Sequence, residues 1–207
     1  MSPTTPTAER ATTKGEETRA QILAAAVQQA SRAGFESLTI GALAEATGLS
    51  KSGLFAHFGS KLDLQIAALD EAARQFTQSV FLPAMKAPRG LKRLRTLMEL
   101  WLKWPSGTDM PGGCPIDAAL REYDHQPGPM REAVLDRQRL LDRELQKAVK
   151  LAIETGELAK NTDAELVAFE IMGIVMSYYR GQHVFGAAPA ARRARAAFDR
   201  LIQSHSA

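Results

Sequence analysis

Apolar residues recur at intervals of three and four along almost the whole chain, and this spacing constrains the fold more than any other feature. A clear example is the stripe of Leu62, Ile66, Leu69, Ala73 and Phe76, which places apolar side chains on one face of a helix. Alternating apolar and polar residues, the pattern typical of strands, are not evident. The sequence therefore predicts an all-α fold.

Glycines and prolines divide the chain into nine expected helices. These cover about residues 16–33, 39–46, 50–55, 60–83, 90–103, 116–124, 129–155, 163–185 and 189–203. We expect two domains after a disordered tail at 1–14: a helix-turn-helix head at 15–62 and a ligand-binding and dimerisation body at 63–207.

Composition narrows the function classes. The chain has 207 residues, 45% of them hydrophobic, a net charge of +3 and one cysteine, so no internal disulfide can form. We find no secretory signal or membrane-spanning run, and predict a cytoplasmic protein. The four histidines lack metal-ligand spacing, and no nucleophile elbow or phosphate loop is present. We predict no enzyme activity, no metal and no cofactor.

The stretch from Thr39 to Leu64 has the properties of a helix-turn-helix. Gly48 gives the backbone freedom that a tight turn needs, and Ala44 is small where the two short helices pass closely. Apolar side chains fill the wedge between them, namely Leu43, Leu49 and Leu54. The second helix is left with a small, polar and basic surface, which fits a major groove.

This stretch resembles the DNA-binding signature of the tetracycline-repressor (TetR) family. The family typically shows a Tyr-x-His-Phe-x-x-Lys run, which appears here as Phe55-Ala56-His57-Phe58-Gly59-Ser60-Lys61. Thr18-Arg19 also looks like the family. The resemblance covers about residues 16–65. It implies a homodimeric repressor that binds a pseudo-palindromic double-stranded DNA operator and is released by a small-molecule inducer.

The resemblance also implies roles for matching residues. Thr39 would contact phosphate, and His57 and Lys61 would clamp it. The residues expected to enter the major groove are Ser50, Lys51, Ser52 and Gly53. Phe55 stands where a tyrosine is usual, so it stays near the DNA but lacks the phenolic donor.

Aromatic and sulfur side chains in the body are candidates to line a ligand pocket. They are Met85, Leu97, Trp101, Trp104, Met110, Cys114, Tyr123, Phe169 and Met172. The alternative is that such a stripe is ordinary core. Cys114 lies between two glycines and Pro115, and a Gly-Cys-Pro element resembles a subset of the family that senses electrophiles or oxidants. Electrophile sensing through Cys114 is therefore an alternative for the signal.

The helix expected at 163–185 is apolar nearly all round, so it needs burial on two sides. We expect it to form a dimer seam with the last helix through Val167, Ile171, Ile174, Val175, Ala194, Phe198 and Leu201. Two other classes stay open. One is a non-specific DNA-binding protein, and the other is a helical ligand-binding module whose head does not bind DNA.

Overall fold

The computed structural model describes residues 13–104, 110 and 112–207, and over these the all-α prediction is confirmed. The first helices are α1 (Lys14–Ala33), α2 (Ile40–Thr47), α3 (Lys51–His57) and α4 (Lys61–Phe76), followed by a π-helical turn, η1 (Thr77–Phe81). The remainder are α5 (Leu82–Met85), α6 (Leu91–Lys103), α7 (Pro115–Glu122), α8 (Pro129–Glu154), α9 (Ala164–Phe185) and α10 (Ala187–Ser204). No helix of these residues is long and apolar enough to cross a membrane.

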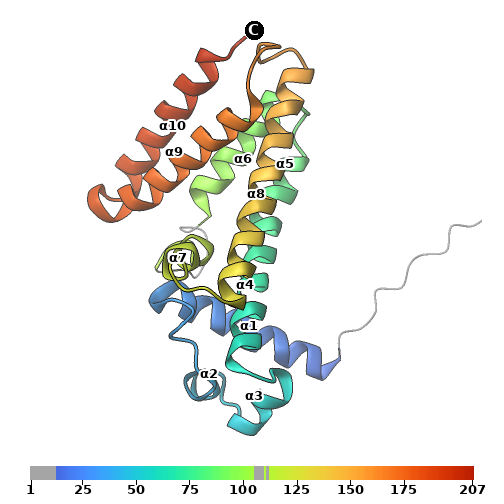
Figure 1. Ribbon diagram of the computed structural model, residues 1–207, viewed down its shortest axis with the longest axis vertical. Coiled ribbons are helices and arrows are strands. Elements are labelled where there is room, and N and C mark those ends of the chain that lie inside the picture. The colour runs from blue at the N-terminus through green and yellow to red at the C-terminus, as the bar shows by residue number, and fades with distance from the viewer. Residues whose placement is uncertain (1–12, 105–109, 111) are drawn as a thin grey trace, which may run out of the picture.

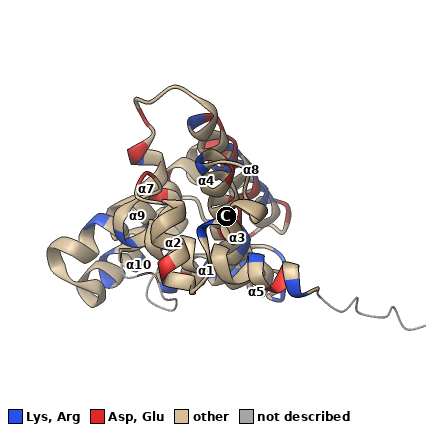
Figure 2. Ribbon diagram, turned by 90° about the horizontal axis from the view of Figure 1, so that it is seen from below, with Lys and Arg blue, Asp and Glu red and all other residues tan. Residues whose placement is uncertain are grey.

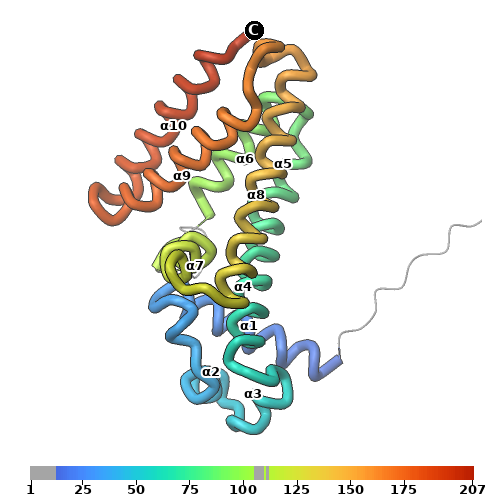
Figure 3. Tube along the Cα trace, in the orientation of Figure 1, coloured from blue at the N-terminus to red at the C-terminus, as the bar shows by residue number. Residues whose placement is uncertain are grey.

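The helices α1, α2 and α3 form a head at one end of an elongated molecule (Figure 1). The helical run that starts with α4 leaves the head and continues into the body, where α8 packs beside it (Figure 3). The pair α9 and α10 projects from the body on the side away from α5 (Figure 1). The short helix α7 lies between head and body and contacts both α1 and α4.

The segments α4, η1 and α5 are one continuous helical run, so counting them once gives the nine predicted helices within the described part. Pro83 lies inside this run rather than ending it. Because proline has no N–H, it cannot donate to the carbonyl of Ser79, and its ring crowds that carbonyl. The π turn directly before Pro83 is the widening that such a break produces.

Helix boundaries follow the capping residues. Thr13 and Glu16 form a capping box, so α1 begins two residues before the expected start. Thr39, Ser50 and Ser60 cap α2, α3 and α4 with their side chains. The disordered tail expected at 1–14 lies outside the described residues, except that Thr13 and Lys14 belong to the start of α1 and correct that boundary.

One apolar core runs from the head into the body. Its centre in the body is an aromatic cluster, in which the Phe76 ring meets Trp101 and Trp104 edge to face at centroid distances of 5.2 and 5.5 Å. Phe76 is the last residue of α4, so this helix joins the head to the centre of the body.

Candidate functional site

The helices α2 and α3 meet across a tight turn at Gly48. This glycine has left-handed backbone angles (φ 68°), and the next N–H, of Leu49, bonds back to the carbonyl of Ala44 at 3.0 Å. Leu43 and Leu54 are fully buried between the helices. The turn and the wedge therefore have the helix-turn-helix geometry.

The outer face of α3 is open to solvent. Ser50 caps the helix by accepting the N–H of Gly53 at 3.0 Å, and its hydroxyl lies 3.1 Å from that of Ser52. Lys51, Ser52 and Phe55 are exposed. Residues of both charges occur along the ribbon at this end of the molecule (Figure 2). The head therefore presents hydrogen-bond donors at particular positions and not a uniformly positive surface.

Arg19 of α1 joins the first helix to this unit. Its guanidinium stacks over the Phe58 ring at 5.1 Å from the centroid. Phe58 itself is buried directly after α3. Two parts of the pattern noted in the sequence, Thr18-Arg19 and the Phe55–Lys61 run, thus meet in space.

Lys61 differs from the expectation. Its ammonium donates to the backbone carbonyl of Glu36 at 2.9 Å and to the carboxylate of the same residue at 2.8 Å. This contact with Lys61 holds the pKa of the Glu36 carboxyl below its usual value. Two of the three N–H donors of the Lys61 ammonium are therefore used at the α1–α2 turn in this conformation.

A small cavity of about 20 Å³ lies in the body, between α4, α6, α7, α8 and α9. Its walls are aromatic, sulfur-containing and aliphatic, with two polar groups: Phe76, Trp101, Cys114, Ile116, Asp117, Gln138, Leu141, Met172, Met176 and Tyr179. Asp117 is buried, and its carboxylate is paired with the exposed guanidinium of Arg121 on the next turn of α7. Asp117 is thus the one charged side chain among the lining residues.

Cys114 occupies the N-cap position of α7, where helix dipoles favour a thiolate, but the thiol is buried. Burial raises its pKa above the ordinary value, although the backbone N–H groups of Asp117 and Ile116 act in the opposite direction. The two preceding glycines therefore do not expose the thiol. A neutral, covered thiol is a poor nucleophile in this conformation.

Two family models match the sequence. "Bacterial regulatory proteins, tetR family" matches residues 22–68, and "Tetracyclin repressor-like, C-terminal domain" matches residues 90–198, which is more than half of the chain. The chain belongs to the TetR family. It is a DNA-binding transcriptional regulator. None of the curated proteins matches the sequence.

Solved TetR structures share the fold. A TetR regulator from Chloroflexus aurantiacus is 24% identical, with a TM-score of 0.79 over 92% of this chain and 94% of that one. One from Cytophaga hutchinsonii is 18% identical, with a TM-score of 0.80 over 95% and 98%. AibR, solved in complex with isovaleryl coenzyme A and operator DNA, is 19% identical, with a TM-score of 0.67 over 91% and 98%.

The structure brings only part of the predicted pocket together. Trp101, Cys114 and Met172 line the cavity. Buried residues that do not line it are Leu97, Trp104 and Met110.

Three residues that the sequence predicted to line the pocket lie away from this cavity. Tyr123 hydrogen-bonds to Glu36 of the head at 2.9 Å, Met85 is exposed at the end of α5, and Phe169 is 72% exposed on the outer face of α9. Sequence reasoning missed other lining residues, chiefly Phe76, Asp117, Gln138, Met176 and Tyr179. Phe76 stood in the predicted apolar stripe, but nothing in that stripe distinguished a cavity wall from core.

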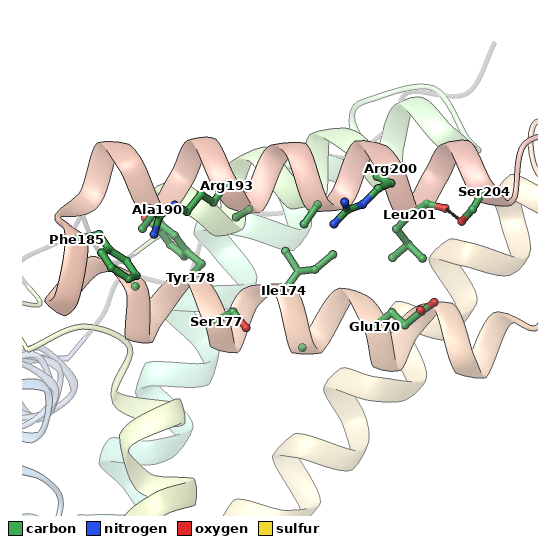
Figure 4. Close-up of a pocket in the computed structure, with 14 residues that line it drawn as sticks. Glu170, Ile174, Ser177, Tyr178, Phe185, Ala190, Arg193, Arg200, Leu201 and Ser204 are labelled. Atoms are coloured by element: carbon green, nitrogen blue, oxygen red, sulfur yellow. Dashed lines mark hydrogen bonds between the residues drawn. The ribbon is translucent and has the colours of Figure 1, made fainter.

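The paired helices α9 and α10 enclose a groove of about 690 Å³ (Figure 4). Ile174, Ala194 and Leu201 of the predicted dimer seam line it. Val167, Ile171 and Val175 are buried inside the subunit, so they cannot add surface to a partner and are corrected. Phe198 is also buried, below the guanidinium of Arg95.

Proposed function

We propose that this TetR regulator is a repressor that binds a pseudo-palindromic operator as a homodimer and is released by a small molecule bound in the body cavity. The observation that carries the proposal is the exposed face of α3, where Ser50, Lys51 and Ser52 offer donors from a helix held rigidly by Leu54. A helix of this kind fits the major groove. The protein would act in the cytoplasm, with the DNA that it controls.

The inducer would be a mainly apolar, aromatic compound. Three aromatic rings and three sulfur atoms surround the cavity, which suits flat apolar ligands. Asp117 adds a carboxylate at the wall, so a neutral or cationic ligand with a hydrogen-bond donor is favoured over an anion. AibR, with its bound acyl coenzyme A and operator, supports the general scheme of a fold that binds both ligand and DNA.

The cavity of about 20 Å³ has room for little more than one water molecule. A drug-sized ligand needs several hundred cubic ångströms. Entry of the inducer therefore requires α7 or α9 to move. The inducer would release the repressor by binding this opened form more tightly than the DNA-bound form.

A second copy of this chain would cover the groove between α9 and α10. The outer face of α9 carries exposed apolar side chains, Leu166 and Phe169, and small residues, Gly173 and Ser177, that allow close helix approach. Leaving such a face in water is unfavourable. Pairing two copies here would place two heads on two half-sites about 34–36 Å apart.

The test measures binding to a specific duplex, selected from a random library by the protein itself, and to a scrambled duplex of equal length, at two salt concentrations. Specific repression predicts a preference of at least about 1,000-fold for the selected duplex. Equal binding to both duplexes would instead identify a non-specific DNA-binding protein, and no binding would identify a ligand-binding module. Phe169→Glu should convert a dimer to a monomer in sedimentation, and a monomeric wild type would contradict the dimer.

A further inference from the structure

The helix α7 connects the cavity to the head. Cys114, its N-cap, and Asp117 in its first turn line the cavity, whereas Glu122 and Tyr123 at its other end contact the turn between α1 and α2. The helix has only eight residues, so both ends belong to one short rigid unit. Figure 1 shows it lying directly between the head and the body.

The carboxylate of Glu122 binds the head through backbone groups. One oxygen accepts the N–H of Phe35 and the other accepts the N–H of Glu36, each at 2.7 Å. Hydrogen bonds to an ionised acceptor are stronger than neutral ones. Gly34 makes this approach possible, because a Cβ at that position would lie 2.8 Å from the carboxylate, and its φ of +83° also favours glycine.

A second set of contacts holds the same turn from α4. The side-chain amide of Gln65 donates to the carbonyl of Phe35 at 2.9 Å and to the Tyr123 hydroxyl at 3.3 Å. The Tyr123 hydroxyl in turn donates to the Glu36 carboxylate at 2.9 Å. Gln65 and Tyr123 are both buried, so these bonds fix the turn against α4 and α7 together.

The cavity end of α7 is attached to the head as well. The Ser31 hydroxyl of α1 donates to the carbonyl of Gly113 at 2.8 Å and accepts the N–H of Gly112 at 3.2 Å. Any Cβ on Gly112 would lie 1.6 Å from the carbonyl oxygen of Ser31. The backbone at Gly112 therefore packs directly on the backbone of Ser31, two residues before Cys114.

We infer that Glu122 is a positioning residue that couples the state of the cavity to the position of the DNA-reading head. This inference rests on the proposed function. A ligand that enlarges the cavity by moving α7 displaces Cys114 and Asp117. Because α7 moves as a unit, Glu122 then moves the backbone N–H groups of Phe35 and Glu36 with it. Coupling is reciprocal, so bound operator holds the cavity closed.

The test uses Cys114, the only cysteine of the chain, as a reporter inside the cavity wall. The rate of its alkylation by N-ethylmaleimide is measured in the whole protein, alone and saturated with the selected duplex. The variants are Glu122→Gln, which keeps one acceptor and turns an amide group toward the second N–H, and the control Asp124→Asn. The control makes the same charge change two residues later, where the Asp124 carboxylate lies near His125 and forms no hydrogen bond or ion pair with a described residue of the head.

Operator should slow alkylation at least about fivefold in the wild type and in Asp124→Asn, since allosteric couplings are commonly of that size. In Glu122→Gln the slowing should fall below about twofold at saturating DNA. Amide exchange at Phe35 and Glu36 should also become faster. If Glu122→Gln does not fold, Tyr123→Phe takes its place, because it removes only the hydroxyl between Gln65 and Glu36. In that variant the slowing of Cys114 alkylation by operator should also be reduced.

Equal slowing in the wild type and the folded Glu122 or Tyr123 variant would overturn the inference. A wild type that binds the selected duplex with no change in alkylation rate would overturn it too. Failure of the wild type to prefer any duplex would instead overturn the proposed function, so the two failures are distinguishable.

Discussion

The indole N–H of Trp101 donates a 2.9 Å hydrogen bond to the hydroxyl oxygen of Tyr179, joining α6 to α9 at the wall of the cavity. Both side chains are buried, and burial raises the pKa of the Tyr179 hydroxyl well above its ordinary value. The hydroxyl therefore stays protonated at neutral pH and is a neutral polar group at the cavity wall.

Tyr179→Phe should lower the free energy of unfolding by about 1–3 kcal/mol, because the buried N–H of Trp101 loses its acceptor. Urea denaturation measures the change. Trp101→Phe and the double variant complete a thermodynamic cycle, in which the coupling between the two side chains should be at least about 0.5 kcal/mol. A coupling near zero would show that this bond contributes nothing to stability.

Phe76→Ala should cost about 3–5 kcal/mol, since it removes the ring that packs on both tryptophans and leaves a larger cavity. Leu82→Ala in the same helical run is the control. Leu82 is exposed, so its loss should cost less than about 1 kcal/mol. Similar losses from both substitutions would mean that the aromatic cluster is not a main source of stability.

Lys51→Ala and His57→Ala should each weaken DNA binding about 5- to 30-fold without changing the melting temperature by more than a few degrees. Both side chains lie on the reading helix, and neither is part of the buried core. Fluorescence anisotropy with the selected duplex measures the effect, and Lys150→Ala on α8 should bind as the wild type does. If both head variants also bind like the wild type, the reading surface lies elsewhere.

The buried thiol of Cys114 should make stability depend on pH in the alkaline range. Burial raises its pKa in the folded state above that of an unfolded thiol, so the protonated thiol stabilises the fold below the unfolded pKa. The contribution is lost as pH rises through the folded pKa. Between about pH 8 and about pH 10 the wild type should therefore lose more stability than Cys114→Ser. Parallel pH profiles for the two proteins would contradict this.

The same variant tests electrophile sensing. Cys114→Ser should still bind DNA and, if the thiol were the sensor, would no longer be released by a reactive aldehyde or quinone. Because the thiol is buried and its pKa is raised, we expect release by such compounds to be slow in the wild type. Rapid release that requires Cys114 would show that the cavity opens readily.

The helices and the turn around Gly48 were predictable because their signals are local. Capping residues such as Thr39 and Ser50 satisfy N–H groups three positions away, and the left-handed turn requires a glycine. The same reasoning predicted where α9 and α10 begin and end to within two residues of the observed positions. The assignment of α3 as the helix that contacts DNA rests on one short run, Phe55 to Lys61, and stays a prediction.

The cavity and the seam were harder to predict because they depend on which side of a helix meets which neighbour. Helix α9 is apolar nearly all round, and periodicity did not show that Val167 faces the subunit core whereas Phe169 faces outward. Tyr123 resembled a pocket residue by type and position in the chain. Its partner, Glu36, is 87 residues away, and no pattern within one helix indicates such a contact.

The hydrogen bonds that Phe35 and Glu36 donate to the Glu122 carboxylate also matter for protein engineering. A head excised after α3 and fused to an unrelated body would leave two backbone N–H groups at the α1–α2 turn without the carboxylate that satisfies them here. Exchange of reading heads between such regulators would therefore have to carry α7 as well, and the smallest transplantable unit is not contiguous in the sequence.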